Sequence, residues 1–194
     1  MPETTTIDDA EAAFAAFMDA LGLEHADDPH LAETPRRVAR SRVNELFRGL
    51  DEDPTRHLDR TFPTESTDLV IVDNIEVTSM CAHHFLPFTG VAHIGYIPTD
   101  RIVGLSKFAR LVDGYARRPQ VQERLTAQVA DAIDTHLDPL ATVVVIEAEH
   151  ECMRLRGVCE PNSVTRTSAL RGRASAESHI KEEFFKLAGI AANR

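Results

Sequence analysis

Residues 69–78 read LVIVDNIEVT, and here the chain changes from a helix-like to a strand-like pattern. β-Branched residues dominate this stretch, and they favour strands because their stiff side chains pack well on a pleated surface. The same pattern returns in residues 91–97, VAHIGYI, and an apolar run follows much later in the chain. We therefore predict four strands, at residues 69–78, 91–97, 142–148 and 163–169.

Two helices are predicted between these pairs of strands. The first spans residues 105–116, and the second follows Pro119, where apolar residues recur every four positions from Val121 to Leu137. A terminal helix is predicted at residues 177–187. The order is β-β-α-α-β-β, with paired strands on either side of paired helices. This order indicates an α+β fold, in which an antiparallel sheet carries the helices on one face.

The N-terminal part has a different, helical character. Apolar residues at helical spacing predict a helix over residues 7–22. Thr34 and Pro35 are typical of a cap followed by proline at the first helical position, which predicts a second helix through Leu50. Residues 51–67 read as a linker. We expect an N-terminal helical extension at residues 1–60 and a main α+β domain, with the terminal helix, at residues 61–194.

Composition limits the class of protein. The net charge of −10 over 194 residues argues against a general nucleic-acid binder, which needs a basic footprint. No run of 18 apolar residues predicts a membrane span. The three cysteines are an odd number, so they predict no disulfide framework. A reducing, cytoplasmic location is the expectation.

The cysteines and histidines are grouped in a way that predicts a metal site. Cys81, His84 and Cys152 provide two thiolates and an imidazole, which suit zinc, and leave a fourth position for water. Strand alternation places His150 on the same face as Cys152. His83 is left free for acid–base chemistry.

Two other interpretations of these residues stay open. Cys159 is a candidate fourth ligand, which would close the site and make it structural. Alternatively the cysteines bind no metal and pack as small hydrophobic side chains.

A basic cluster predicts a phosphate site. Ser106 and Lys107 open the helix predicted at residues 105–116, and Arg110 lies one turn further on the same face. Arg156 lies an even number of residues from Cys152, so strand alternation directs it to the metal side. A solvated basic helix face is the plainer interpretation of such a cluster.

Four motifs, in this order along the chain, resemble the GTP cyclohydrolase I family. They are SMCAHHFLPF at residues 79–88, GLSK at 104–107, RPQVQERLT at 118–126, and HECM at 150–153 with RGV at 156–158. The segment TPRRVA at residues 34–39 is similar to the family's N-terminal helical segment. The resemblance covers roughly residues 10–188.

The resemblance implies a fold, an assembly and a reaction. The fold is the tunnelling fold, whose β-β-α-α-β-β units associate side by side into a barrel. The assembly is a toroidal homodecamer with sites between subunits. The reaction converts GTP to 7,8-dihydroneopterin triphosphate and formate, the first step of folate and other pterin biosynthesis. One Zn²⁺ per subunit is expected as the cofactor.

The resemblance also implies a role for each matching residue. The expected zinc ligands are Cys81, His84 and Cys152. The expected catalytic residues are His83, His150 and Ser106. Together with Ser106, the expected triphosphate and ribose contacts are Lys107, Arg110 and Arg156. Arg40 is expected as a further basic residue near the triphosphate. The expected guanine contacts are Gln122 and Glu123. Alternatively, Glu123 only stabilises its helix, because a negative charge in the first turn interacts favourably with the helix dipole.

Two alternatives to this function stay open at the level of sequence. One is a non-catalytic tunnelling-fold protein that binds a purine or a pterin, with zinc in a structural role. The other is a related hydrolase that opens a purine ring and stops at the formamide, or that serves a deazapurine pathway.

Overall fold

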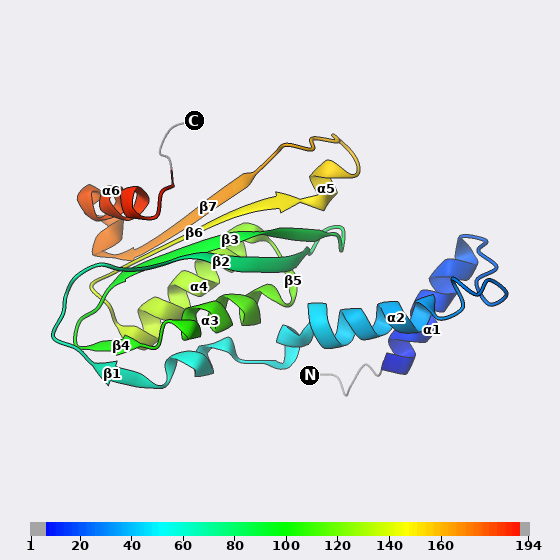
Figure 1. The fold of residues 1–194 in the computed structure, drawn as a ribbon, viewed down its shortest axis with the longest axis horizontal. Helices are drawn as coiled ribbons and strands as arrows, with labels where there is room; N and C mark the ends of the chain where they lie inside the picture. The colour runs from blue at the N-terminus through cyan, green and yellow to red at the C-terminus, as the bar shows by residue number, and fades with distance from the viewer. Residues whose placement is uncertain (1–6, 191–194) are drawn as a thin grey trace. The chain divides into compact units, whose positions relative to one another are not determined.

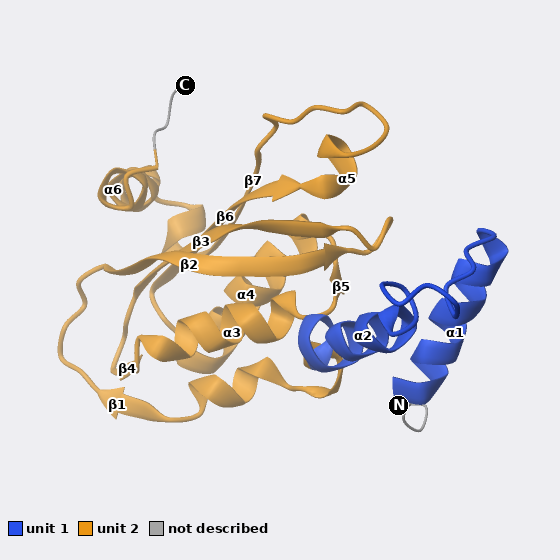
Figure 2. Ribbon diagram, turned by 45° about the vertical axis from the view of Figure 1, so that its right-hand side comes forward, with its two compact units in different colours: residues 1–48 blue, residues 49–194 orange. Residues whose placement is uncertain are grey.

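The computed structural model describes residues 7–190 of the chain. Figure 2 shows its two compact units, one ending at residue 48 and the other beginning at residue 49. The predicted domain division at residues 60 and 61 stays a prediction. Within the described residues, no helix combines the length and the apolar character needed to cross a membrane.

The first unit is helical, as predicted. It contains α1 (Ile7–Ala20) and α2 (Thr34–Ser41), and Arg36 of α2 donates a hydrogen bond of 2.6 Å to Glu11 of α1. The predicted cap is wrong, because Glu33 precedes the helix and no side chain caps it, although Pro35 does lie in the first turn.

The prediction of one α-helix through Leu50 is also wrong beyond Ser41. A π-helical turn follows (η1, Arg42–Leu46), in which the amide of Phe47 bonds the carbonyl of Arg42, and then a 3₁₀ turn (η2, Arg48–Asp51). The spacing of apolar residues does not distinguish these turns from an α-helix. In 3₁₀, α and π helices alike, residues about three to five positions apart lie on the same face.

The second unit is built on a five-stranded sheet with the order β5-β2-β3-β6-β7. Its long strands are β2 (Val70–Cys81), β3 (Pro87–Ile97), β6 (Ala141–His150) and β7 (Thr165–Gly172). All four pair antiparallel, which confirms the predicted sheet, while the short β5 (Pro119–Gln120) joins β2 in parallel. β2 and β3 extend further than predicted, and their extra residues lead into the hairpin that carries Cys81.

The segment predicted as a linker contains short elements. A 3₁₀ turn (η3, Pro54–Leu58) precedes β1 (Thr61–Pro63), which pairs with β4 (Arg101–Val103). The sequence analysis missed both strands, because three residues are too few to show an alternation. The second unit therefore begins in ordered structure rather than in a free linker.

Two helices cover one face of the sheet, as predicted, and Figure 1 shows them side by side beneath it. They are α3 (Ser106–Ala116) and α4 (Gln122–Leu137). Phe88, Leu111, Val129 and Val144 lie in the core between these helices and the sheet. The α+β class and the order of its elements are thereby confirmed.

The other face of the sheet carries the terminal helix α6 (Ser178–Leu187). Val143 and Val145 alternate with Val144 along β6 and pack with Phe184 in a separate core. Gly95 of β3 must be a glycine here, because an added Cβ would lie 2.5 Å from the ring of Phe184.

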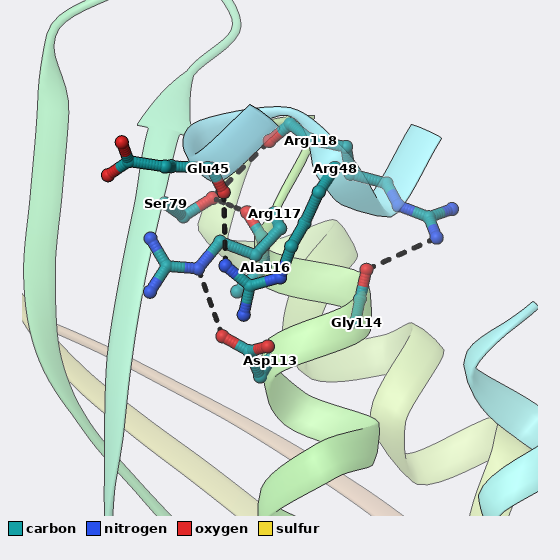
Figure 3. Close-up of polar contacts among 8 residues, drawn as sticks. All are labelled: Glu45, Arg48, Ser79, Asp113, Gly114, Ala116, Arg117 and Arg118. Carbon is teal, nitrogen blue, oxygen red and sulfur yellow. Dashed lines mark hydrogen bonds and ion pairs between the residues drawn. The ribbon is translucent and has the colours of Figure 1, made fainter. Parts of the chain in front are cut away.

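Polar contacts stabilise the end of α3 and join it to β2 (Figure 3). Within this end of the helix, the guanidinium of Arg118 donates to the carbonyl of Gly114 at 3.2 Å, and Arg117 pairs with Asp113 at 2.9 Å. The hydroxyl of Ser79, on β2, donates to the carbonyl of Ala116. The Ser79 bond therefore holds the last turn of α3 beside the end of β2, close to Cys81 in sequence.

Candidate metal centre and catalytic site

A tight hairpin turn presents Cys81, His83 and His84. The amide of Cys81 donates to the carbonyl of Leu86 at 2.9 Å, and the amide of Phe85 donates to the carbonyl of Cys81 at 2.8 Å. Phe85 adopts a left-handed backbone with φ of 53°, which closes the turn. Both histidines therefore project from a rigid turn at the end of β2.

The second ligand segment differs from the sequence prediction. The strand β6 ends at His150, and residues Glu151–Arg154 form a helical turn, α5, rather than more strand. Strand alternation therefore does not apply to Cys152 or to Arg156, so the geometric reason given for both was wrong. Cys152 reaches the site from a helical turn, while His150 lies at the end of the strand.

The structure brings Cys81, His84 and Cys152 together. Their ligand atoms all lie within 4.8 Å of one another, and the Sγ of Cys81 lies 3.9 Å from the Nδ1 of His84. Two thiols and an imidazole at this separation fit a divalent zinc ion. Burial raises the pKa of the Cys152 thiol, and the neighbouring Cys81 raises it further, so a bound cation would be needed to favour the Cys152 thiolate.

Cys159 is exposed and lies outside this group. Within the part of the chain that the structure describes, no fourth cysteine, histidine or carboxylate joins the three ligand atoms. Three ligand atoms therefore converge in the described part of the chain.

His83 lies beside the group without being part of it. Its Nδ1 is 3.9 Å from the Sγ of Cys81, and its ring stands at 75° to that of His84, with 6.3 Å between the ring centroids. The side chain is exposed. An exposed imidazole at this position is accessible to substrate and can exchange protons with it.

His150 is held on two sides. Its ring stacks on Phe88, with 4.6 Å between centroids and 13° between planes, and its Nε2 lies 2.7 Å from the Oε1 of Gln122. Burial lowers the pKa of His150, while Glu123 acts in the opposite direction. The stack and the hydrogen bond leave the ring one orientation.

Gln122 and Glu123 open α4 but lie in different environments. Gln122 is 2% exposed, and its amide bonds groups inside the protein. Glu123 is exposed and lines a shallow pocket of about 450 Å³ with Ser168 and Arg171 of β7. Only Glu123 therefore offers a free side-chain group to a ligand.

Arg156 reaches the metal group from the loop after α5. Its guanidinium lies 3.1 Å from the Nε2 of His84. The loop that carries it exposes apolar side chains, Leu155 at 70% and Val158 at 69%. A cation thus stands at the rim of the candidate metal centre.

Ser106, Lys107 and Arg110 lie elsewhere in the same chain. They occupy the start of α3, whereas its last residue, Ala116, adjoins β2 near Cys81. At 1.5 Å per residue, the ten residues from Ser106 to Ala116 span roughly 15 Å. Figure 1 shows β4, which leads into α3, at the opposite end of the sheet from α5. The structure does not bring the two groups together within one chain.

One residue near this cluster was missed by the sequence analysis. Burial lowers the pKa of His57, and three neighbouring cations lower it further: Arg56, Arg110 and Lys107. His57 lies in η3, inside the segment predicted as a linker, so no spacing in the sequence pointed to it. Arg40 lies in α2, in the first unit, and its role stays a prediction.

The family model and the relatives found by comparison with known proteins all indicate the same family. The sequence pattern of the family described as GTP cyclohydrolase I matches residues 10–189. GTP cyclohydrolase 1 of Corynebacterium glutamicum is 52% identical over 92% of this chain and 91% of its own length. The protein of the same name from Carboxydothermus hydrogenoformans is 49% identical over 92% of this chain and 93% of its own.

A third relative, the GTP cyclohydrolase 1 of Mycobacterium tuberculosis, is 55% identical over 92% of this chain and 88% of its own. Among solved structures, the apo form of the archaeosine synthase QueF-Like aligns with 56% of this chain and 97% of its own, with a TM-score of 0.47 and 18% identity.

Proposed function

The chain belongs to the GTP cyclohydrolase I family, and we propose that it opens the imidazole ring of GTP, releases formate and forms 7,8-dihydroneopterin triphosphate, the first step of folate biosynthesis. The observation that carries the proposal is the meeting of Cys81, His84 and Cys152 from two distant segments, with His83 beside Cys81. Zn²⁺ is the proposed cofactor, one per subunit, because two thiols and an imidazole suit it.

Cys81, His84 and Cys152 would hold the metal, and Zn²⁺ bound there would supply a nucleophile by lowering the pKa of water to about 7. His150 in its doubly protonated form delivers one proton to nitrogen 7 of the purine, and its stack on Phe88 keeps the ring in place. His83, exposed beside Cys81, moves protons between the substrate and solvent. These two imidazoles divide the proton transfers of ring opening between them.

The remaining residues bind GTP. Glu123 accepts hydrogen bonds from the amidine-like edge of guanine, and the pocket it shares with Arg171 gives the base room. Ser106 assists the opening of the ribose. The proposed triphosphate contacts are Lys107, Arg110, Arg156 and Arg40, four cations on a chain whose net charge is −10.

We propose further that the working site is shared between subunits of a ring-shaped homo-oligomer, a decamer in this family. The separation of Ser106, Lys107 and Arg110 from Cys81 along α3 supports this assembly. A neighbouring chain that places the start of its α3 against this chain's hairpin would complete the site. The cytoplasm is the proposed location, because the ligand set needs two reduced thiols.

The reaction is tested by incubating the metal-replete protein with GTP and following formate together with the ultraviolet signature of the pterin. Both products are expected. Formamide without pterin would instead indicate a hydrolase that stops early, and no turnover would indicate a binding protein. The variant His150→Ala is expected to lose formate release, and near-full turnover by this variant would contradict the assigned role.

The shared site is tested by complementation. Chains that carry Lys107→Ala and chains that carry His150→Ala are each expected to be inactive alone. When the two are co-assembled, some sites receive the intact half of each chain, so activity is expected to return. If every site were built from one chain alone, every site in the mixed assembly would carry one of the two substitutions. No activity would then return.

A further inference from the structure

The side-chain amide of Gln122 is fixed in one orientation by groups that accept hydrogen bonds. Its Nε2 lies 3.0 Å from the carbonyl of Ile146 and 3.0 Å from the carbonyl of Thr165, and 3.2 Å from the hydroxyl of Thr167. Backbone carbonyls only accept, so the nitrogen of the amide must face them. The oxygen of the amide therefore faces the other way, toward His150.

This orientation determines which nitrogen of His150 carries the hydrogen. The Oε1 of Gln122 is an acceptor only, and it lies 2.7 Å from the Nε2 of His150. A hydrogen bond at this distance requires the hydrogen on Nε2. In the neutral ring, Nδ1 is then the nitrogen with the free lone pair.

We propose that Gln122 is a positioning residue, which holds His150 in the Nε2–H tautomer and thereby presents Nδ1 to the reacting atoms. The proposal rests on the proposed function for the role of His150, but the tautomer itself does not. The side chain of Gln122 touches no substrate in this arrangement, because both of its polar atoms are engaged inside the protein and it is buried. The guanine edge is left to Glu123.

The surrounding residues make the arrangement rigid. The hydroxyl of Thr126 bonds the carbonyl of Gln122 at 2.8 Å and shares a 2.6 Å hydrogen bond with Thr167. On the other side of the imidazole, the stack with Phe88 restricts rotation of the ring. An imidazole oriented by a second group is the arrangement that catalytic triads use to select a tautomer.

The direct test is solid-state ¹⁵N magnetic resonance of histidine-labelled, zinc-loaded protein, in which the signal lost in His150→Asn identifies the ring. We expect protonated Nε2 and unprotonated Nδ1 in the original protein, and appearance of the other tautomer in Gln122→Met. An Nδ1–H ring in the original protein, or an unchanged ring in Gln122→Met, would overturn the proposal. This measurement needs no turnover, so failure of the proposed reaction is distinguished from failure of this inference.

Kinetics separate a positioning role from guanine binding. In Gln122→Met, kcat is expected to fall about 10- to 100-fold, with KM for GTP changed less than about threefold. A raised KM with unchanged kcat would instead identify Gln122 as a guanine contact. The matched control is Gln128→Leu on the same helix, which loses only the bond to Gln120 and should keep both constants.

A second variant covers the case in which Gln122→Met does not fold. Gln122→Glu keeps an acceptor facing His150 when its other carboxyl oxygen is protonated and donates to the carbonyls of Ile146 and Thr165. This variant is therefore expected to retain the Nε2–H tautomer. Its turnover is expected to exceed that of Gln122→Met or, if that variant does not fold, that of Gln122→Ala. Loss of the tautomer in Gln122→Glu would contradict the assignment.

Discussion

The hydroxyl of Ser79 donates a 2.6 Å hydrogen bond to the backbone carbonyl of Ala116, and so joins the end of β2 to the end of α3 (Figure 3). Ser79 is 1% exposed, and Cys81 follows it by two residues on the same strand. The position of the hairpin turn that carries Cys81 therefore depends on a hydrogen bond between a strand and a helix that are far apart in sequence.

Replacing Ser79 by alanine is expected to lower the free energy of unfolding by about 0.5–1.5 kcal/mol. The loss is mainly that of the short bond to Ala116, because the contact with the carbonyl of Arg118 is long, at 3.5 Å. The carbonyl of Ala116 keeps a second donor, the amide of Arg118 at 2.8 Å. Denaturant unfolding measures the change. Ser163→Ala is the control, since its hydroxyl makes an exposed local bond to Glu160, and an equal effect in both variants would argue against the special role of Ser79.

Gly49→Ala is expected to destabilise the protein by about 1–3 kcal/mol or more. An added Cβ would lie 2.4 Å from the carbonyl oxygen of Gly114 and 2.8 Å from that of Arg117, and backbone atoms cannot move aside as a side chain can. Thermal unfolding is the measurement. Gly104→Ala serves as the control because its nearest neighbour, Lys107, lies at 3.9 Å, so equal losses in the two variants would contradict the steric argument.

His93 is expected to make stability depend on pH. Burial lowers its pKa below the ordinary value of 6.5, although Glu147 and Asp73 act in the opposite direction. As the pH falls below 6.5, the unfolded chain takes up this proton before the folded chain does, so stability decreases, by at most about 1.4 kcal/mol per pH unit for one proton. Above that window the contribution is fully present.

The check is unfolding of His93→Gln between pH 5 and pH 7, compared with the original protein and with His179→Gln, an exposed control. The slope of stability against pH is expected to be smaller in His93→Gln alone. An unchanged slope would exclude His93 as its source.

Metal content is expected to distinguish the cysteines. Cys152→Ser should lose bound zinc, because it removes one of three converging ligands, whereas Cys159→Ser should keep it, because Cys159 is exposed and outside the group. Elemental analysis of the purified variants decides between the two outcomes. Zinc lost from Cys159→Ser would mean that the site is closed by a fourth side chain.

Local pattern predicted the elements of this fold well wherever they are long. The β-branched run in residues 91–97 and the apolar spacing of four from Val121 to Leu137 were each long enough to predict an element, and β3 and α4 form there. Elements of three or four residues are too short to show such a pattern. For this reason β1, β4 and the helical turn after His150 were missed.

The sequence by itself determined the types and order of the long elements and the identity of the residues able to bind a metal, because these depend on side-chain chemistry and on spacing along one segment. Only the tertiary structure decided that Cys152 reaches Cys81 from a helical turn, that Ser106 lies at the far end of α3, and that Gln122 faces His150. Such relationships arise where separate segments pack together, and periodicity within a segment contains no information about its neighbour.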